Sequence, residues 1–103
     1  MEPTAEVKPT DVEGLIRYHA AIHGADADAM VAVARCESNL NPTAVGDVAL
    51  GGSYGTWQIF SKAHPTVTRA QAFDPDWSSD WAARQFAKGN ARIWTCSRLL
   101  GIV

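Results

Sequence analysis

The chain has 103 residues, of which 47% are apolar and 19% are charged, and its formal net charge is −2. This length suits one domain with a modest core, and the composition is ordinary for a soluble globular protein. The small net charge argues against a nucleic-acid-binding surface and against electrostatic attachment to a membrane. No apolar run approaches the roughly 20 residues that a membrane-spanning helix needs.

Residues 1–9 are rich in proline, glutamate and threonine, and they lack the apolar core of a signal peptide. They predict a flexible N-terminal arm or the end of a linker, followed by one domain over residues 10–103. Two routes to the site of action stay open. Either a signal has been removed from the chain, or the protein is delivered in another way.

The first predicted helix begins with a capping box, in which Thr10 and Glu13 would satisfy each other's backbone donors. Apolar residues and histidines then recur at helical spacing from Val12 to His23. Gly24 is a natural end for this helix, because glycine readily adopts the left-handed conformation of a C-terminal cap.

The second predicted helix is capped by Asp26 or Asp28 and ends in the stretch 39–42, because proline disfavours a helical residue before it. One face of this helix carries residues at positions i, i+3, i+4 and i+7, namely Met30, Val33, Ala34 and Glu37. A carboxyl group thus continues the apolar face at the last turn. Burial and the C-terminal end of the helix dipole both raise the pKa of such a group.

A carboxylic acid that stays protonated near neutral pH is what a glycosidase needs to protonate a leaving glycosidic oxygen. Helical spacing therefore makes Glu37 a candidate catalytic acid. The alternative is that Glu37 only caps the helix or forms an ion pair, for example with Arg35.

The elements after the second helix are shorter. Glycines in residues 43–56 predict turns and a small irregular β-hairpin. The predicted helices are a short one opening at 56–60 and closed by His64-Pro65, a brief one from Thr66 or Thr68 to Ala72, and a stronger one from Asp76 to Gly89. The tail, residues 93–100, is apolar enough to pack back on the domain.

Cys36 and Cys96 lie far apart in the sequence, which excludes a CxxC redox pair and leaves too few thiols for a cysteine-rich zinc site. A disulfide between them would close a loop of about 60 residues and contribute roughly 4 kcal/mol on the chain-entropy account. On spacing alone, two buried free thiols are an equal alternative.

A longer string around Glu37 carries a family resemblance. Residues 36–47 read Cys-Glu-Ser-Asn-Leu-Asn-Pro-Thr-Ala-Val-Gly-Asp, and residues 52–59 read Gly-Ser-Tyr-Gly-Thr-Trp-Gln-Ile. Together with His64-Pro65 and Phe73-Asp74-Pro75, they resemble the soluble lytic transglycosylases and goose-type lysozymes, above all the lysozyme-like domains of phage tail proteins. The resemblance covers residues 29–96, with Thr56 in place of the usual leucine. It implies an α+β, predominantly helical, lysozyme-like fold with a small β-hairpin beside the cleft.

The resemblance also implies roles for individual residues. Glu37 matches the family's general acid, and Ser38 matches a serine that supports the acid or the sugar. A glycine at position 55 lets backbone approach a saccharide, and the amide of Gln58 offers a donor and an acceptor to an N-acetyl group. The predicted substrate-binding residues are Ser38, Ser53, Tyr54, Gly55, Trp57 and Gln58. For Trp57, packing in the core is an expectation of at least equal weight.

Asp47 is the only acidic residue between Glu37 and Gln58. In goose-type lysozymes an aspartate in a similar place helps to position an attacking water, so an Asp47 that faces Glu37 would favour an inverting hydrolase. An Asp47 that only forms a turn would instead imply a lytic transglycosylase, in which the muramyl 6-hydroxyl replaces water.

Resuscitation-promoting factors, which are relatives on a similar fold, also show Cys-Glu-Ser and pair that cysteine with one near the C-terminus. The segment Trp94-Thr95-Cys96 resembles that ending. A Cys36–Cys96 disulfide is therefore implied, and with it an extracytoplasmic location. In larger transglycosylases an aromatic side chain from a later helix closes the cleft, and here it is either missing or supplied by Trp81 or Phe86.

The predicted function is cleavage of the β-1,4 bond between N-acetylmuramic acid and N-acetylglucosamine in peptidoglycan, with Glu37 as general acid and base. The alternative is a non-catalytic peptidoglycan-binding or structural module of the same fold. The expected partner is the glycan strand, with no nucleic acid and no cofactor, and the isolated domain is expected to be a monomer. No metal site is expected, because His19, His23 and His64 lack clustered ligand spacing.

Overall fold

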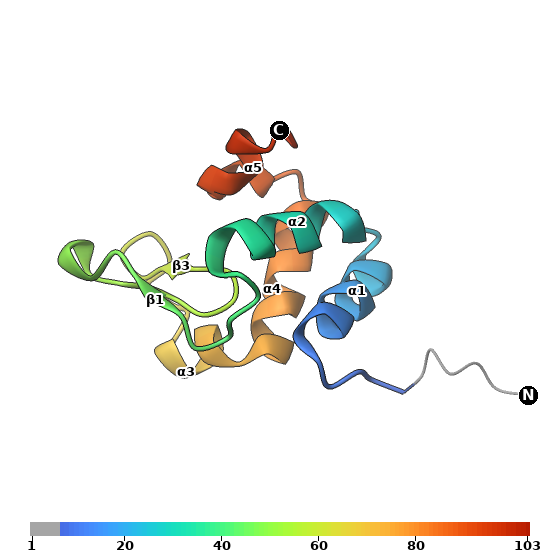
Figure 1. Ribbon diagram of the computed structural model, residues 1–103, viewed down its shortest axis with the longest axis horizontal. Coiled ribbons are helices and arrows are strands. Elements are labelled where there is room, and N and C mark those ends of the chain that lie inside the picture. The colour runs from blue at the N-terminus through green and yellow to red at the C-terminus, as the bar shows by residue number, and fades with distance from the viewer. Residues whose placement is uncertain (1–6) are drawn as a thin grey trace, which may run out of the picture.

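The structure is a computed structural model that describes residues 7–103, so most of the predicted arm lies outside the described residues. The helices are α1 (Val12–His23), α2 (Ala27–Ser38), α3 (Arg69–Phe73), α4 (Pro75–Ala87) and α5 (Thr95–Leu99). The strands are β1 (Val45–Gly46), β2 (Ser53–Tyr54) and β3 (Ile59–Phe60), and short 3-10 turns η2 (Val48–Leu50) and η3 (Ala91–Ile93) complete the order. The fold is mainly helical with a small antiparallel sheet, as predicted (Figure 1).

Helix α1 begins at a different cap from the one that the sequence predicts. The carboxylate of Asp11, and not the hydroxyl of Thr10, accepts a hydrogen bond from the backbone N–H of Gly14. The capping box is therefore wrong, because a glycine now stands three residues after the cap and has no side chain to return the bond. Glu13 instead forms an ion pair with Arg17. The predicted end is confirmed, since Gly24 closes the helix with φ at 70°.

Helix α2 is capped by Asp26, whose carboxylate accepts a hydrogen bond from the N–H of Ala29. The helix ends at Asn39, which adopts the left-handed conformation that asparagine tolerates better than most residues. The predicted apolar face is confirmed, because Met30, Val33 and Ala34 are completely buried.

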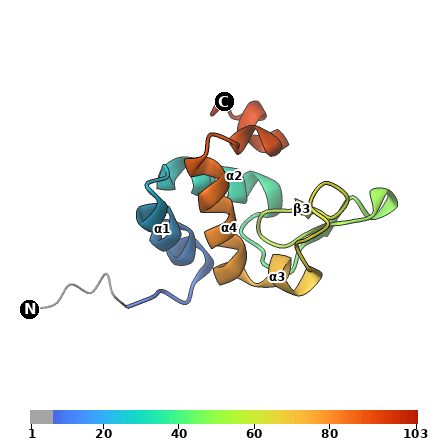
Figure 2. The ribbon, with the colours of Figure 1, turned by 180° about the vertical axis from the view of Figure 1, so that it is seen from behind.

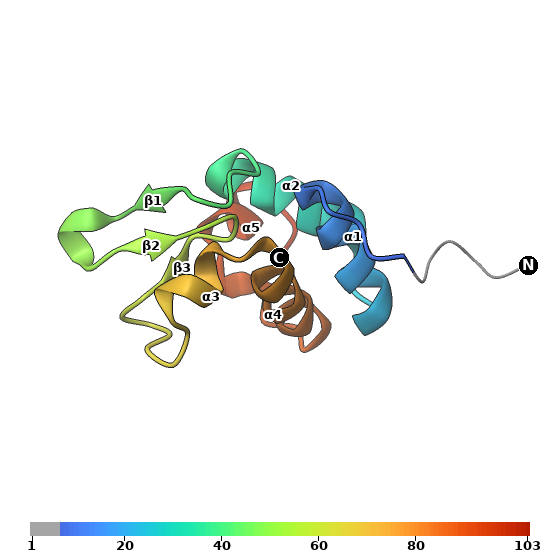
Figure 3. The same cartoon turned by 90° about the horizontal axis from the view of Figure 1, so that it is seen from below.

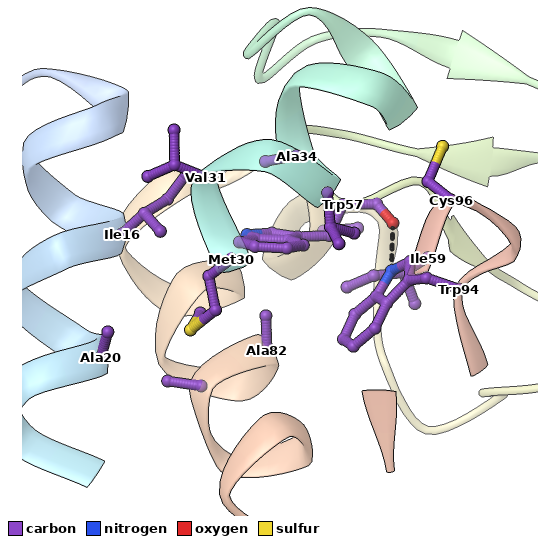
Figure 4. Close-up of a cluster of buried hydrophobic side chains, with 13 residues drawn as sticks. Ile16, Ala20, Met30, Val31, Ala34, Trp57, Ile59, Ala82, Trp94 and Cys96 are labelled. Atoms are coloured by element: carbon purple, nitrogen blue, oxygen red, sulfur yellow. Dashed lines mark hydrogen bonds between the residues drawn. The ribbon is translucent and has the colours of Figure 1, made fainter. Parts of the chain in front are cut away.

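Helices α1, α2 and α4 pack together around the main core. Figure 4 shows Ile16 and Ala20 of α1, Met30 and Ala34 of α2, and Ala82 of α4 turned toward one another and toward the ring of Trp57. Seen from behind, α4 lies between α1 and the sheet (Figure 2). Helices α1, α2 and α4 therefore form one side of the molecule, and the sheet, with α3 beside it, forms the other.

The sheet confirms the predicted β-hairpin and adds a third strand. Strand β2 pairs antiparallel with both β1 and β3, in a register that places Gly46 opposite Ser53 and Ser53 opposite Phe60. The β1–β2 hairpin, with η2 at its tip, extends away from the helices (Figure 3).

The short helix predicted to open at residues 56–60 is wrong. Gly55 and Gln58 both have positive φ, 82° and 46°, and a turn between them leads directly into β3. Two left-handed residues so close together cannot belong to a right-handed helix. The turn instead directs the side chain of Trp57 inward, where none of it is exposed.

The later helices follow their capping residues closely. Thr68, and not Thr66, caps α3, and it forms a capping box with Gln71. Asp74 caps α4 by accepting hydrogen bonds from the N–H groups of Asp76 and Trp77, with Pro75 at the first helical position. The predicted break at residues 73–75 thus ends α3 and begins α4.

The tail packs back on the domain, as predicted. Trp94 is buried, and its indole N–H donates to the carbonyl oxygen of Trp57 over 2.8 Å (Figure 4). A disulfide joins Cys96 to Cys36, so α5 is tied to the C-terminal half of α2 (Figure 1). The implied disulfide is therefore confirmed, and both cysteines of the chain belong to it.

Candidate active site

Glu37 lies on the last turn of α2, one residue after the disulfide-bonded Cys36. The residue is half-buried and continues the face of α2 that carries Met30 and Val33. Its Oε2 atom accepts a hydrogen bond of 3.2 Å from the backbone N–H of Cys96. The disulfide therefore holds the donor of this hydrogen bond next to the acid.

The surroundings of Glu37 shift its acidity. Burial raises the pKa of the Glu37 carboxyl above its ordinary value of 4.5, the N–H of Cys96 opposes this rise, and the negative charge of Asp47 adds to it. Burial dominates because it removes water from the charged form. Glu37 consequently stays protonated to a higher pH than an exposed glutamate does.

Glu37 opens into a pocket of about 220 Å³ between α2, the sheet and the C-terminal segment. Its walls are formed by Glu37, Asp47, Ser53, Gln58, Phe60, Ile93, Trp94 and Thr95. A neighbouring pocket of about 320 Å³ shares several of these residues and continues to His64 and Trp81. The two pockets have Gln58, Phe60, Ile93 and Trp94 in common, so they lie next to each other.

Asp47 is the second carboxylate of the Glu37 pocket. It is exposed, it has a positive φ of 50°, and its Oδ2 accepts a hydrogen bond of 2.7 Å from the hydroxyl of Ser53. Ser53 itself is almost completely buried. The sheet thus fixes the Asp47 carboxylate through a side chain that is anchored in the interior.

Gln58 also lines the pocket, but much of its amide is already engaged. Its Nε2 donates to the carbonyl oxygens of Ala44 and Gly55, over 3.2 and 3.0 Å. A Cβ atom on Gly46 would lie 2.4 Å from the Gln58 Oε1, so this glycine leaves room for the amide. The donor that the resemblance implies for an N-acetyl group is therefore used within the protein.

Ser38 and Gly55 hold the turn between Gly55 and Gln58 in place next to the cleft. The hydroxyl of Ser38 donates to the carbonyl oxygen of Thr56 over 2.7 Å, which joins the end of α2 to the turn before β3. Gly55 packs against α3 so closely that a Cβ atom would lie 1.9 Å from the carbonyl oxygen of Ala72. Both residues act through the backbone next to the site.

Two predicted sugar-contacting aromatic residues lie elsewhere. Trp57 is completely buried, and its indole N–H donates to the hydroxyl of Ser79, so the prediction that it packs against a sugar is wrong. Its large apolar ring fills the centre of the core, which is the alternative that the sequence left open. Tyr54 lines a different pocket with Arg69, whose guanidinium lies 4.8 Å from the centre of the tyrosine ring.

Sequence reasoning missed part of the cleft wall, namely Phe60, Ile93, Trp94 and Thr95. The cysteines could have predicted Ile93, Trp94 and Thr95. Glu37 follows Cys36 directly, and these three residues directly precede Cys96, so a disulfide between the cysteines brings them close to Glu37. Of the two aromatic residues proposed to close the cleft, Trp81 lines the neighbouring pocket, and Phe86 packs against Trp57.

The fold and the site together define a mainly helical α+β domain whose cleft, between helices and a small sheet, carries a half-buried acid. A family model described as lysozyme like domain matches residues 16–96, most of the chain and all of the cleft residues. The chain belongs to this family of lysozyme-like domains, which is related to peptidoglycan glycosidases and transglycosylases. Comparisons with curated proteins and with solved structures gave no match.

Proposed function

We propose that this domain cleaves the β-1,4 bond between N-acetylmuramic acid and N-acetylglucosamine in peptidoglycan, with Glu37 as the general acid. One observation carries the proposal. Glu37 is half-buried in a pocket that Asp47 also lines, where burial raises the pKa of its carboxyl. A carboxyl with a raised pKa keeps its proton to higher pH and can protonate the glycosidic oxygen as the bond to the anomeric carbon breaks.

The cleavage step leaves Glu37 as a carboxylate and the muramyl ring as an oxocarbenium-like centre. The N–H of Cys96 favours the charged carboxylate, so it helps the acid to release its proton. Burial favours the neutral form before the step. The two opposing influences keep the Glu37 pKa raised without preventing ionisation.

Asp47 favours water as the second reactant. Its carboxylate lines the same pocket as Glu37 and is held by Ser53, as a general base would need to be. In hydrolysis Asp47 accepts a proton from water while the oxygen of that water bonds to the anomeric carbon. In transglycosylation the muramyl 6-hydroxyl attacks instead and gives its proton to Glu37, which leaves a 1,6-anhydro end.

Glu37→Gln tests the catalytic role against a module that only binds the wall. We expect clearing of purified cell walls to fall by roughly 10²–10⁴-fold, because an amide of the same shape cannot donate the proton. Glu13→Gln is the matched control, since Glu13 pairs with Arg17 and Arg35 on the helical side of the molecule. Equal clearing by wild type and Glu37→Gln would overturn the assignment, and a wild type that binds walls without clearing them would indicate the binding module.

The products identify the second reactant. Mass spectra of digested peptidoglycan should show reducing ends, and Asp47→Asn should lose this hydrolysis. Products lighter by one water would instead carry 1,6-anhydro ends, would identify a lytic transglycosylase, and would remove Asp47 from the role of base.

We also propose an extracytoplasmic place of action, which the disulfide and a wall substrate both favour. In residues 7–103, none of the helices has the length and apolar character to cross a bilayer. As an isolated domain the protein should be a monomer, which light scattering during size-exclusion chromatography measures directly.

A further inference from the structure

Two histidines of α1 and two aspartates of α4 meet at the interface of these helices, away from the cleft. His19 and His23 are four residues apart, as are Asp76 and Asp80, so each pair projects from one face of its helix. Helices α1 and α4 lie side by side and pack directly against each other (Figures 1 and 2). The fold thus supplies carboxylates that the spacing of the histidines alone did not show.

His19, His23 and Asp80 place one possible ligand atom each close to the other two. The His23 Nε2 lies 2.7 Å from the Asp80 Oδ1, and the His19 Nδ1 lies 3.5 Å from the same oxygen. All three ligand atoms lie within 4.8 Å of one another. A tetrahedral zinc ion with bonds of about 2.0 Å separates its ligand atoms by about 3.3 Å. Small side-chain movements are enough to reach this geometry.

The state of His19 is the second observation that points to a ligand. Its side chain is 9% exposed, and its Nδ1 has no hydrogen-bond partner among residues 7–103. Its other ring nitrogen, Nε2, lies 2.6 Å from the Asp76 Oδ1. An Nε2–H that donates to Asp76 leaves a lone pair on Nδ1, buried and directed at the Asp80 carboxylate. A cation between the two would remove this unfavourable arrangement.

We propose that His19 Nδ1, His23 Nε2 and Asp80 Oδ1 bind a divalent transition-metal ion of the zinc class, with water at a fourth position. Imidazole and carboxylate are suitable ligands for such ions. Asp76 orients His19 in the way that a carboxylate next to a metal-bound histidine does. The ion joins α1 to α4 outside the cleft, so its effect is on stability and not on the cleavage step.

Neighbouring cations bind the carboxylate oxygens that face away from the two histidines. Arg84 bonds to the Asp80 Oδ2 over 3.0 Å, and Lys8 bonds to the Asp76 Oδ2 over 2.8 Å, so both use the opposite oxygen of each carboxylate. Their positive charges weaken the attraction for a metal ion.

The test uses the full chain, stripped of metal with a chelator, and Zn²⁺ alone as the probe. At a Zn²⁺ concentration about a hundred times the Kd, Tm should rise by about 10 °C or more, and chelator should reverse the rise. NMR spectra of the wild type should show one equivalent of Zn²⁺ shifting the ring signals of His19 and His23 while those of His64 stay in place.

His23→Ala and Asp80→Asn should each abolish the Zn²⁺-dependent rise in Tm. His64→Ala is the matched control, because it removes a histidine that lies against Trp81 in the cleft, and it should keep the rise. Far-UV circular dichroism identifies any variant that does not fold, and the wild-type NMR titration needs no variant. No rise in Tm, a rise that survives both ligand substitutions, or shifts confined to His64 would each overturn the site.

Discussion

At the scale of single residues, Glu37 shows how its position on a helix raises the pKa of a carboxyl group. The residue continues an apolar face, so packing of that face partly buries a carboxyl. The carboxyl then has a raised pKa, with one N–H of the tail as its stabilising partner. The catalytic role that we propose for Glu37 therefore depends on a buried carboxyl that lowers the stability of the fold, which is common at active sites.

Burial, together with the charge of Asp47, should set the upper pH limit of the proposed activity. In the proposed reaction, cleavage requires protonated Glu37, so the rate should fall as pH rises through the Glu37 pKa. Asp47→Asn removes a charge that raises this pKa, and the alkaline limb of the residual activity should move to lower pH. A pH–rate profile of wall clearing measures the shift.

Asp28→Asn is the control for this profile, because it makes the same change in net charge on an exposed residue that pairs with Arg17. Its alkaline limb should match that of the wild type. An identical shift in both variants would mean that net charge, and not Asp47, sets the limb.

Glu37→Gln should also make the fold more stable at neutral pH. The folded protein keeps the Glu37 proton to a higher pH than the unfolded chain, whose pKa is near 4.5, so the free energy of unfolding falls as pH rises from 4.5 through the folded-state pKa. Glutamine carries no such penalty. Wild type and variant should therefore be equally stable at acid pH and diverge above it.

Urea denaturation at a series of pH values measures this divergence. Glu13→Gln should show no gain, since it removes the ion pairs of Glu13 with Arg17 and Arg35. A constant difference between Glu37→Gln and wild type across the pH range would contradict the titration account.

Individual residues also mark the limit of sequence reasoning. Helical spacing placed Glu37 on the buried face correctly, because a period of 3.6 depends only on local geometry. The orientation of Trp57 could not be predicted in the same way, because it depends on the turn between Gly55 and Gln58. Packing against α4 and the tail directs this side chain into the core, and no local sequence pattern reveals those contacts.

At the scale of elements, caps and turns decide where the site is built. Helix ends at Gly24, Asn39 and Asp74 follow from cap preferences and were predicted within a residue or two. The helix predicted to open at residues 56–60 does not form, because Gln58 has a left-handed backbone conformation that glutamine rarely adopts. Three hydrogen bonds from Gln58, two of its side chain and one of its own N–H, stabilise the turn.

Gly55→Ala should separate this turn from α3. The added Cβ would meet the backbone oxygen of Ala72 at 1.9 Å, and the φ of 82° is strained for alanine. We expect a loss of about 3 kcal/mol in the free energy of unfolding, from backbone strain and overpacking together. Denaturant unfolding measures the loss.

Gly89→Ala provides the matched comparison for this substitution. Gly89 has a nearly equal φ of 81°, but a Cβ there would meet nothing within 4 Å. Only the conformational penalty applies, so a loss of about 1 kcal/mol is expected. Equal losses at the two glycines would show that contact with α3 does not matter.

At the scale of the whole molecule, the turn around Trp57 is bonded to two other parts of the fold, α4 and the tail. Its indole bonds to Ser79 of α4, and its carbonyl oxygen accepts from Trp94 of the tail. The disulfide adds a covalent link between the tail and α2. Spacing alone left this disulfide undecided, because two cysteines 60 residues apart meet only once the tail has folded back.

Replacing both cysteines with serine should reduce the free energy of unfolding by about 4 kcal/mol, because the unfolded chain then regains the freedom of a long open loop. Denaturant titration of the double variant beside the oxidised wild type measures this loss. Chemical reduction of the wild type should produce the same loss. A reduced protein as stable as the oxidised one would mean that noncovalent packing of the tail is sufficient.

The disulfide also separates the synthesis of the chain from the completion of the site around Glu37. A newly synthesised chain with reduced thiols has neither the closed loop nor the Cys96 N–H held covalently beside Glu37. Both appear where thiols are oxidised, outside the reducing compartment in which proteins are made. For the wall-directed activity that we propose, the bond would therefore act as a form of latency, which ends where thiols are oxidised.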